Sequence, residues 1–220
     1  SKTSIYLNVQ IDWRLYSGKL LMHETRSSPL IIMCAPNGAR LGKSDHESIP
    51  LTATELADCA EKLLSNGVSV LHLHVRDDDG RHSLDADRYR NAIAAIRKRV
   101  DDQLVLQVTT EAVGMYDRHQ QMTLVRELRP EAVSLALREL CPEGIPVTEA
   151  SDFFHEIRRE NIWPQYILYS ADEVARFEKL RQDGVFGEEN PFALFVLGRY
   201  SDSLQGDPAE LDAFLGAFKP

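Results

Sequence analysis

The stretch Val70-Leu71-His72-Leu73-His74-Val75-Arg76-Asp77 decides the fold of this chain. Its apolar residues run from Gly67 into the polar turn Asp77–Gly80, which is typical of a buried β-strand. Because strand side chains alternate between faces, we expect His72 and His74 on one face and the leucines on the other. Two imidazoles about 6–7 Å apart on one face suit two ligands of one metal ion. The alternative is a pair of hydrogen-bonded histidines at a strand end.

The composition limits the kinds of partner. The chain has 220 residues, 43% of them hydrophobic, and 25 Lys+Arg against 34 Asp+Glu give a net charge of −9. That length supports one sizeable core or two small ones. The acidic balance argues against nucleic acid and anionic membranes as main partners. No apolar run approaches the roughly 20 residues of a membrane helix, and no apolar leader is visible. The three scattered cysteines predict a reduced, cytoplasmic compartment.

Residues 1–29 are expected to form a separate extension. Ser4–Ile11 alternates like a strand, and Lys19–His23 could pair with it across Tyr16-Ser17-Gly18 as a hairpin or arm. Residues 30–220 then form the main domain, which follows Arg26–Pro29.

The main domain repeats one pattern: a short apolar run, a polar loop and an amphipathic helix. Strands are predicted at Leu30–Ala35, Val68–Val75, Leu104–Thr109, Ala132–Leu137, Tyr166–Tyr169 and Phe192–Leu197. Helices are predicted at Thr52–Ser65, Asp85–Val100, Asp117–Leu128, Thr148–Glu160, Ser170–Asp183 and Asp207–Ala217. Thr52 with Glu55, and Ser170 with Glu173, match capping boxes, and Pro208 is placed at the first position of the last helix.

Six successive βα units predict a parallel α/β sheet with right-handed crossovers. An open doubly wound sheet and a TIM-type (β/α)8 barrel both fit this order. No Gly-x-Gly-x-x-Gly follows the first strand, and no phosphate-binding loop is present. Polar side chains follow successive strands, as in a barrel site. These are Asn37, Arg40, His72, His74, Thr109, Thr110, Glu111, Arg138, Glu139, Gln165 and Arg199. The prediction is therefore a barrel of which this chain holds about six of eight units.

A metal held by two histidines needs a further protein ligand and an open position for substrate. The candidates for that ligand are Glu111, Glu139 and His82, and the choice stays open. Such a metal would polarise a carbonyl or activate water. Hydroxyl groups and arginines near this strand could bind an acidic substrate, although they could equally serve as loop contacts or surface ion pairs. They belong to Ser83, Thr110, Arg40 and Arg199.

Five segments together resemble the beta-keto acid cleavage enzymes, from about Leu30 to the C-terminus. They are Ile31–Gly42, His72–Asp77, Asp79–Ser83, Gln107–Thr110 and Phe195–Gly198. The resemblance implies a (β/α)8 barrel, usually a homotetramer, with one divalent metal, generally zinc. It implies that a β-keto acid and acetyl-CoA give acetoacetate and a new acyl-CoA. It also implies that His72 and His74 bind the metal, and that Ser83 and Thr110 bind the substrate carboxylate.

The chain also departs from that family. The family takes a third ligand, a glutamate, with a neighbouring acidic residue and an arginine, from its last two barrel strands, and this chain ends after its sixth unit. Arg40 stands where the type enzyme has a glutamate for a substrate amine, which favours an anionic or polar substrate tail. Gln165 replaces a glutamate that often follows Trp163-Pro164, and Glu111-Ala112 replaces a glycine pair.

The candidate roles follow from these matches. Arg76 and Gln165 are the candidate catalytic residues, and His72 and His74 are the candidate metal ligands. Candidate substrate-binding residues are Asn37, Arg40, Ser83, Thr110 and Glu111. Small-molecule β-keto acid and acetyl-CoA are the expected partners, and a homo-oligomer, tetramer or dimer, is expected.

Two other functions remain open. A truncated or degenerate barrel would bind a metabolite or a partner subunit without cleavage activity. Its unpaired strand edges would favour association, and the N-terminal hairpin could cover such an edge or swap into a neighbouring subunit. A different metal-dependent lyase, such as an aldolase, would cleave without acetyl-CoA.

Overall fold

The computed structural model describes residues 31–188, 191–199 and 206–218. The predicted N-terminal hairpin lies outside these residues. Six strands form one parallel sheet in the order β1-β2-β5-β6-β7-β8. Their bounds are Met33–Cys34 (β1), Val70–Leu73 (β2), Val105–Thr109 (β5), Ala132–Ala136 (β6), Trp163–Leu168 (β7) and Phe192–Phe195 (β8). Val75–Arg76 (β3) and His82–Ser83 (β4) form a separate antiparallel pair.

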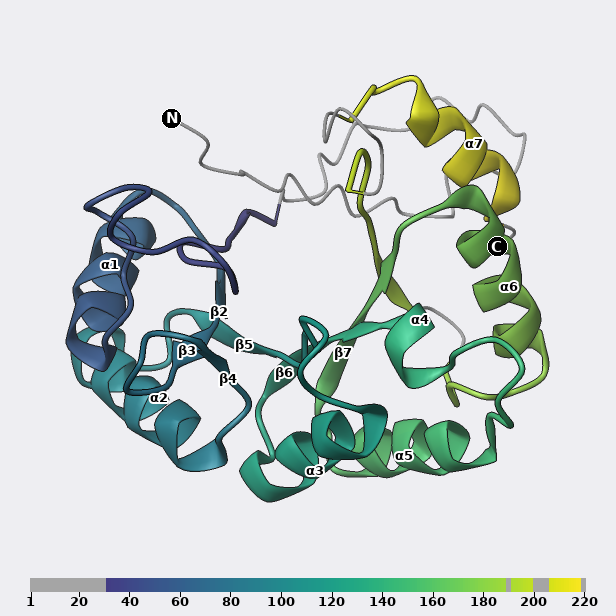
Figure 1. The fold of residues 1–220 in the computed structure, drawn as a ribbon, viewed down its shortest axis with the longest axis horizontal. Coiled ribbons are helices and arrows are strands. Elements are labelled where there is room, and N and C mark those ends of the chain that lie inside the picture. The colour runs from purple at the N-terminus through teal and green to yellow at the C-terminus, as the bar shows by residue number, and fades with distance from the viewer. Residues whose placement is uncertain (1–30, 189–190, 200–205, 219–220) are drawn as a thin grey trace, which may run out of the picture.

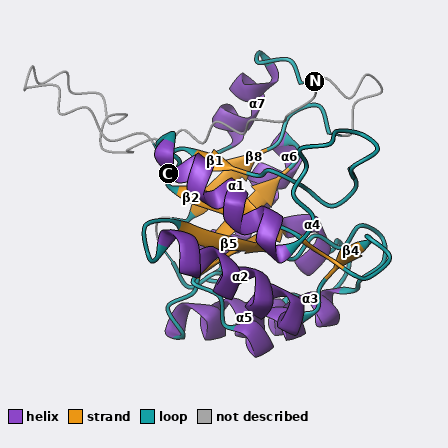
Figure 2. Ribbon diagram, turned by 90° about the vertical axis from the view of Figure 1, so that its left-hand side faces the viewer, coloured by secondary structure: helices purple, strands orange, loops and turns teal. Residues whose placement is uncertain are grey.

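The helices lie along the outer side of a curved sheet, so the strands form an arc (Figure 1). Their bounds are Ala53–Ser65 (α1), Ala86–Val100 (α2), Arg118–Leu128 (α3), Leu137–Leu140 (α4), Thr148–Arg159 (α5), Ala171–Gln182 (α6) and Glu210–Ala217 (α7). Seen from the side, α1 and α2 cover the strands nearest to the viewer (Figure 2). This arrangement is that of a partial TIM-type α/β fold. None of the helices described here is long and apolar enough to cross a membrane.

The two faces of the sheet differ in chemistry. Alternate residues of each inner strand join the hydrophobic clusters that include the helices: Leu71, Leu73, Leu106, Val108, Val133, Leu135, Tyr166 and Leu168. The residues that alternate with them along the strands include His72, Gln107, Ser134 and Gln165. Since side chains alternate along a strand, these polar residues occupy the concave face. That face is therefore where a polar ligand would meet the sheet.

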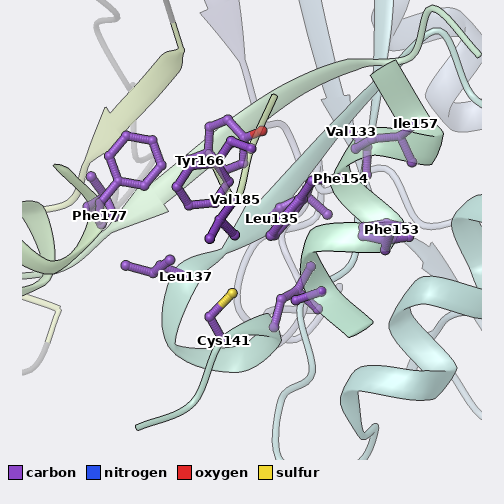
Figure 3. Packing of buried hydrophobic residues seen from close by; sticks show 14 of the residues in the cluster. Val133, Leu135, Leu137, Cys141, Phe153, Phe154, Ile157, Tyr166, Phe177 and Val185 are labelled. Atoms are coloured by element: carbon purple, nitrogen blue, oxygen red, sulfur yellow. The ribbon is translucent and has the colours of Figure 1, made fainter. Parts of the chain in front are cut away.

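Two hydrophobic clusters stabilise the outer face. The first joins α1 and α2 to β2 and β5, with Leu56, Tyr89 and Ile96 almost fully buried. The second joins β6 and β7 to α5, α6 and the turn that carries Phe186. In the second cluster, Phe177 lies beside Tyr166, with ring centroids 5.1 Å apart (Figure 3).

Side-chain caps begin four of the described helices, α1, α2, α3 and α6, and those at α1 and α6 were predicted. Thr52 and Glu55 form a complete capping box at α1. At α6 the Ser170 hydroxyl accepts from the Glu173 amide, but the Glu173 carboxylate accepts from the Tyr169 amide instead of closing the box. The Asp117 carboxylate caps α3, and there Gln120 closes the box. These caps satisfy backbone N–H groups that the helix cannot pair internally.

Several predicted boundaries were wrong. The last helix begins at Glu210 and not near Asp207, so Pro208 is not at its first position. The strand predicted over Val68–Val75 is interrupted at His74, because the chain leaves the sheet there to form the β3–β4 hairpin. β7 begins at Trp163 and contains Pro164. Proline usually argues against a strand, which explains why the prediction began only at Tyr166.

Candidate functional site: a histidine cluster on the concave face

Three histidine rings lie side by side where β2 ends. His72 is on β2, which lies between β1 and β5, and His74 follows in the break before β3. The Nε2 atoms of His72 and His74 are 3.1 Å apart, and the ring centroids are 5.0 Å apart. His82, on β4, places its ring centroid 5.2 Å from that of His74. The structure therefore brings the two predicted ligands together and adds a third imidazole.

Backbone contacts hold the second histidine in place. The Asn37 side-chain amide donates to the carbonyl oxygen of His74 at 2.8 Å, and its oxygen accepts from the amide of His74 at 3.3 Å. Asn37 was predicted to bind substrate. Here both ends of its amide bind the backbone of His74, so Asn37 acts in this conformation as a positioning residue.

Two glutamines continue the polar row from His72. The Nδ1 atom of His72 lies 2.7 Å from Oε1 of Gln107, and Nε2 of Gln107 donates to Oε1 of Gln165 at 3.2 Å. The Nε2 atom of Gln165 is buried and has no hydrogen-bond partner within the described ranges. Gln165, a predicted catalytic residue, thus presents an unused donor on the concave face.

The geometry of the histidine pair fits a divalent metal. Zn–N distances of about 2.0–2.1 Å in a tetrahedral site place neighbouring nitrogens about 3.3 Å apart, close to the observed separation. Burial lowers the pKa of His72, His74 and His82, so the imidazoles are neutral, as metal ligands must be. The Nδ1 atoms of His74 and His82 are buried without a hydrogen-bond partner among the residues described.

The third ligand is not assembled. Over the described part of the chain, no group of three His, Cys, Asp or Glu side chains is arranged to hold a metal ion. Of the three candidates, His82 binds the backbone oxygen of Glu111 through Nε2 at 2.9 Å. The Glu139 carboxylate accepts from the Ala112 amide and from Gln121, at 3.1 and 2.6 Å. Burial raises the pKa of Glu139.

Charged side chains lie beside the histidines. Arg40 Nη1 contacts Glu111 Oε1 at 2.8 Å, and Arg199 Nη2 approaches the same oxygen at 3.8 Å. The Arg40 side chain is 53% exposed, against 26% for Glu111. Two arginines facing one carboxylate leave a net positive charge, so this cluster suits an anionic group. It also occupies the Glu111 carboxylate, a candidate metal ligand.

The two predicted hydroxyl groups both contact the backbone. The Thr110 hydroxyl donates to the carbonyl oxygen of Ser134 at 3.0 Å, which uses its only hydrogen. The Ser83 hydroxyl oxygen accepts from the Asp85 amide at 3.2 Å, which leaves its hydrogen able to donate. In this conformation Ser83 is thus the better placed donor of the two.

Arg76, the other predicted catalytic residue, binds a loop. Its guanidinium donates to the carbonyl oxygens of Ala39, Gly38 and Leu41 at 2.6, 2.7 and 2.9 Å. Gly38 has a φ of +61°, a backbone conformation that favours glycine. These contacts make Arg76 a positioning residue for the loop after β1, and a catalytic role for it stays a prediction.

Sequence reasoning missed Gln107 and Ser134 as members of the site. Both are at most 2% exposed, and the hydroxyl oxygen of Ser134 has no hydrogen-bond partner within the described residues. Each polar residue stands between two apolar residues of a buried strand, Leu106-Gln107-Val108 and Val133-Ser134-Leu135. This alternation of apolar and polar residues is the sequence pattern that could have identified Gln107 and Ser134.

A curved parallel sheet with outer helices and a polar concave face defines an α/β protein of the TIM-barrel type. The solved ternary complex of ObcA with a C4-CoA adduct and oxalate has the same fold, with a TM-score of 0.51 and 19% identity. The match covers 69% of this chain and 38% of that one. A 3-dehydroquinate dehydratase from Enterococcus faecalis gives a TM-score of 0.50 at 14% identity, covering 76% of this chain and 68% of that one.

The chain belongs to the beta-keto acid cleavage enzyme family, whose model matches residues 29–219. A 3-keto-5-aminohexanoate cleavage enzyme from Fusobacterium nucleatum is 40% identical over 106 residues, which is 48% of this chain and 38% of that protein. A 3-oxoadipate:acetyl-CoA acetyltransferase from Cupriavidus necator is 32% identical over 110 residues, 50% of this chain and 38% of that protein. The resemblance seen in the sequence is thereby confirmed. The chain spans less than two fifths of the length of these curated relatives.

Proposed function

We propose that this chain carries the metal- and substrate-binding part of a zinc-dependent beta-keto acid cleavage enzyme. In the proposed reaction, R–CO–CH2–COO⁻ and CH3–CO–SCoA exchange acyl groups. The bond between the keto carbon and the methylene carbon breaks, and the methylene carbon forms a bond to the acetyl carbon. The products are acetoacetate and R–CO–SCoA. The relative from Cupriavidus necator, named as a 3-oxoadipate:acetyl-CoA acetyltransferase, supports this reaction class.

The observation that carries the proposal is the convergence of His72 Nε2 and His74 Nε2, 3.1 Å apart at the carboxyl edge of β2. Barrel enzymes place their chemistry at this edge. His72 and His74 would hold the divalent metal, which would supply Lewis-acid polarisation of a carbonyl group. Neutral, buried imidazoles favour such binding because no proton has to leave them first.

The remaining polar groups would bind and orient the substrate. Arg40 and Arg199 would attract an anionic tail, since both face the Glu111 carboxylate and their combined charge exceeds its own. The hydroxyl of Ser83 and the free amide N–H of Gln165 would donate to substrate oxygens. Holding both reactants in one orientation is worth several kcal/mol in reactions of this kind.

One observation favours the alternative, a non-catalytic barrel that binds a metabolite or a partner subunit. Throughout the described residues, two imidazoles converge without a third ligand arranged beside them. A metal-dependent aldolase is the remaining alternative. It would cleave a β-keto acid without acetyl-CoA.

The test is metal content, followed by turnover. We expect about one zinc per chain by elemental analysis, with loss in His72→Ala and His74→Ala. His119→Ala is the matched control, since His119 is 61% exposed and contacts Glu149 on α5. A panel of β-keto acids is then assayed for new acyl-CoA, with and without acetyl-CoA.

Each outcome separates the candidates. Acyl-CoA formed only with acetyl-CoA, and fastest with a dicarboxylic keto acid, supports the proposal. Cleavage without acetyl-CoA would identify an aldolase. Zinc without any turnover, or no zinc at all, would favour the non-catalytic barrel. Sedimentation of the same samples tests the homo-oligomer expected from the sequence.

A further inference from the structure

Gln107 and Gln165 form a hydrogen-bonded chain that ends on a ring nitrogen of His72. Gln107 is on β5, directly beside His72 in the register of the sheet. Gln165 is on β7, two strands further along, so the contact between the two amides crosses β6. Gln107 is 0% exposed and Gln165 is 1% exposed. Water cannot readily supply substitute hydrogen bonds to side chains buried to this extent.

The hydrogen bonds that link Gln165, Gln107 and His72 run in one direction. Nε2 of Gln107 donates to Oε1 of Gln165, so Oε1 of Gln107 faces His72. An amide oxygen can only accept, and it lies 2.7 Å from Nδ1. The proton of neutral His72 is therefore on Nδ1. Its Nε2 then carries the lone pair and accepts the hydrogen bond from Nε2 of His74, which lies 3.1 Å away.

The reverse direction would have the opposite effect. If both amides turned over, Gln165 would donate to Gln107, and the Gln107 amino group would donate to Nδ1 of His72. The proton of His72 would then sit on Nε2, where it would block metal binding through that atom. The orientation of two amides thus decides which nitrogen of His72 is available.

We infer that Gln107 and Gln165 are positioning residues that fix His72 in the Nδ1–H tautomer and so present its Nε2 lone pair toward His74. The value of this lone pair as a metal ligand rests on the proposed function. The assignment of the Nδ1–H tautomer does not depend on the proposed function. Gln165 acts through Gln107, because its oxygen selects the direction in which the Gln107 amide is turned.

The experiment is ¹⁵N NMR of the histidine rings in the metal-free, full-length chain at neutral pH. In the wild type we expect His72 to show a protonated nitrogen signal at Nδ1 and an unprotonated one at Nε2. Gln165→Glu keeps this pattern, since a carboxylate can only accept and holds the Gln107 amide in the same direction. Gln107→Glu also keeps it, because a carboxylate accepts from Nδ1–H. Gln107→Met loses it and gives a mixture of tautomers.

Gln121→Met is the control for the loss of a buried glutamine. Gln121 is 1% exposed and binds the Thr110 carbonyl oxygen and Glu139, with no contact to His72. His72 keeps its Nδ1–H signal in this variant. A wild-type spectrum with the proton on Nε2, or an unchanged His72 tautomer in Gln107→Met, would overturn the inference.

Zinc affinity separates this inference from the proposed function. Loss of a hydrogen-bond partner behind a ligand typically weakens metal binding about 10–100-fold. We expect this loss in Gln107→Met and a near wild-type affinity in Gln107→Glu, by titration against a competing chelator. If no variant binds zinc but the tautomers follow the expected pattern, the proposed metal site fails and the positioning role stands. Equal zinc affinity in Gln107→Met and wild type would contradict the link between the tautomer of His72 and metal binding.

Discussion

At the scale of single residues, Glu188 is a buried carboxyl group with an unusual environment. The Tyr166 hydroxyl donates to its Oε1 at 2.7 Å, and its side chain is only 8% exposed. Burial raises the pKa of Glu188, and the hydrogen bond from Tyr166 and the charge of Arg158 only partly oppose this effect. The folded protein therefore holds this proton more tightly than the unfolded chain does.

This shift predicts a pH dependence of stability. The contribution of Glu188 to stability is fully present below its unfolded pKa, near 4.5. It falls as the pH rises from that value through the raised folded pKa, because unfolding then releases a proton. Glu188→Gln keeps an acceptor for Tyr166 and cannot ionise. Its unfolding free energy in urea should match that of the wild type at low pH and exceed it above this window.

The control is Glu143→Gln, an exposed carboxyl group. Its difference from the wild type should not follow the pH dependence seen for Glu188→Gln. A constant difference between Glu188→Gln and the wild type across the whole pH range would contradict the role of burial.

The residues of the site differ in how far the sequence could predict them. His72 and His74 were predictable because a strand places alternate residues on one face. Gln107 was missed because a glutamine gives no motif of its own, and its importance comes from a contact across strands to Gln165. The ion pair of Arg40 with Glu111 joins residues 71 apart in the chain. No local pattern indicates such a pairing.

At the scale of elements, helix α1 depends on its first turn. Thr52 and Glu55 satisfy backbone N–H groups at both ends of the capping box, and Lys43 contacts Glu55. Thr52→Ala should lower the unfolding free energy by about 1 kcal/mol. The matched control is Thr123→Ala in the exposed middle of α3, where alanine should be neutral or slightly stabilising. Equal losses in both variants, measured by urea unfolding, would contradict the capping role.

The loop after β1 depends on Arg76. Lysine carries its three donors on one atom and cannot reach all the carbonyl oxygens that the guanidinium binds. Arg76→Lys should cost roughly 2–4 kcal/mol of unfolding free energy. Amide hydrogen exchange over residues 36–42 should be faster in the same variant. Arg81→Lys, at a side chain that is 63% exposed, is the control and should leave this loop protected.

Helix ends could be predicted where side chains define them and not where only a proline does. Thr52, Asp117 and Ser170 accept hydrogen bonds from the first turn of their helices. Pro208 is compatible with a first helical position, but helix α7 begins two residues later. A cap is a specific contact, whereas proline is only tolerated at such a position. The β3–β4 hairpin also escaped prediction, because each of its strands has two residues.

At the scale of the whole molecule, two hydrophobic clusters share one sheet. The cluster of α1, α2, β2 and β5 is joined to that of α5, α6, β6 and β7 through the pairing of β5 with β6. Leu56→Ala and Leu168→Ala are matched probes, since these leucines are 1% and 0% exposed. Each should cost about 2–5 kcal/mol.

The two variants should differ in where protection against hydrogen exchange is lost. Leu56→Ala should raise exchange mainly in α1 and α2, and Leu168→Ala mainly in α5 and α6, because each leucine packs in its own cluster. The same pattern of exchange in both variants would show that the sheet transmits the loss throughout. Wild-type exchange under the same conditions is the reference.

The order of the strands in the sheet follows their order in the chain, apart from the β3–β4 hairpin. During synthesis, each strand after the first therefore leaves the ribosome later than the strand beside which it pairs. Once β5 has been synthesised, both strands that pair with the histidine strand β2 are available. Gln165 and Arg199 emerge later, from β7 and from the segment after β8. The strands that hold the histidine pair are thus synthesised before the residues that complete its polar surroundings.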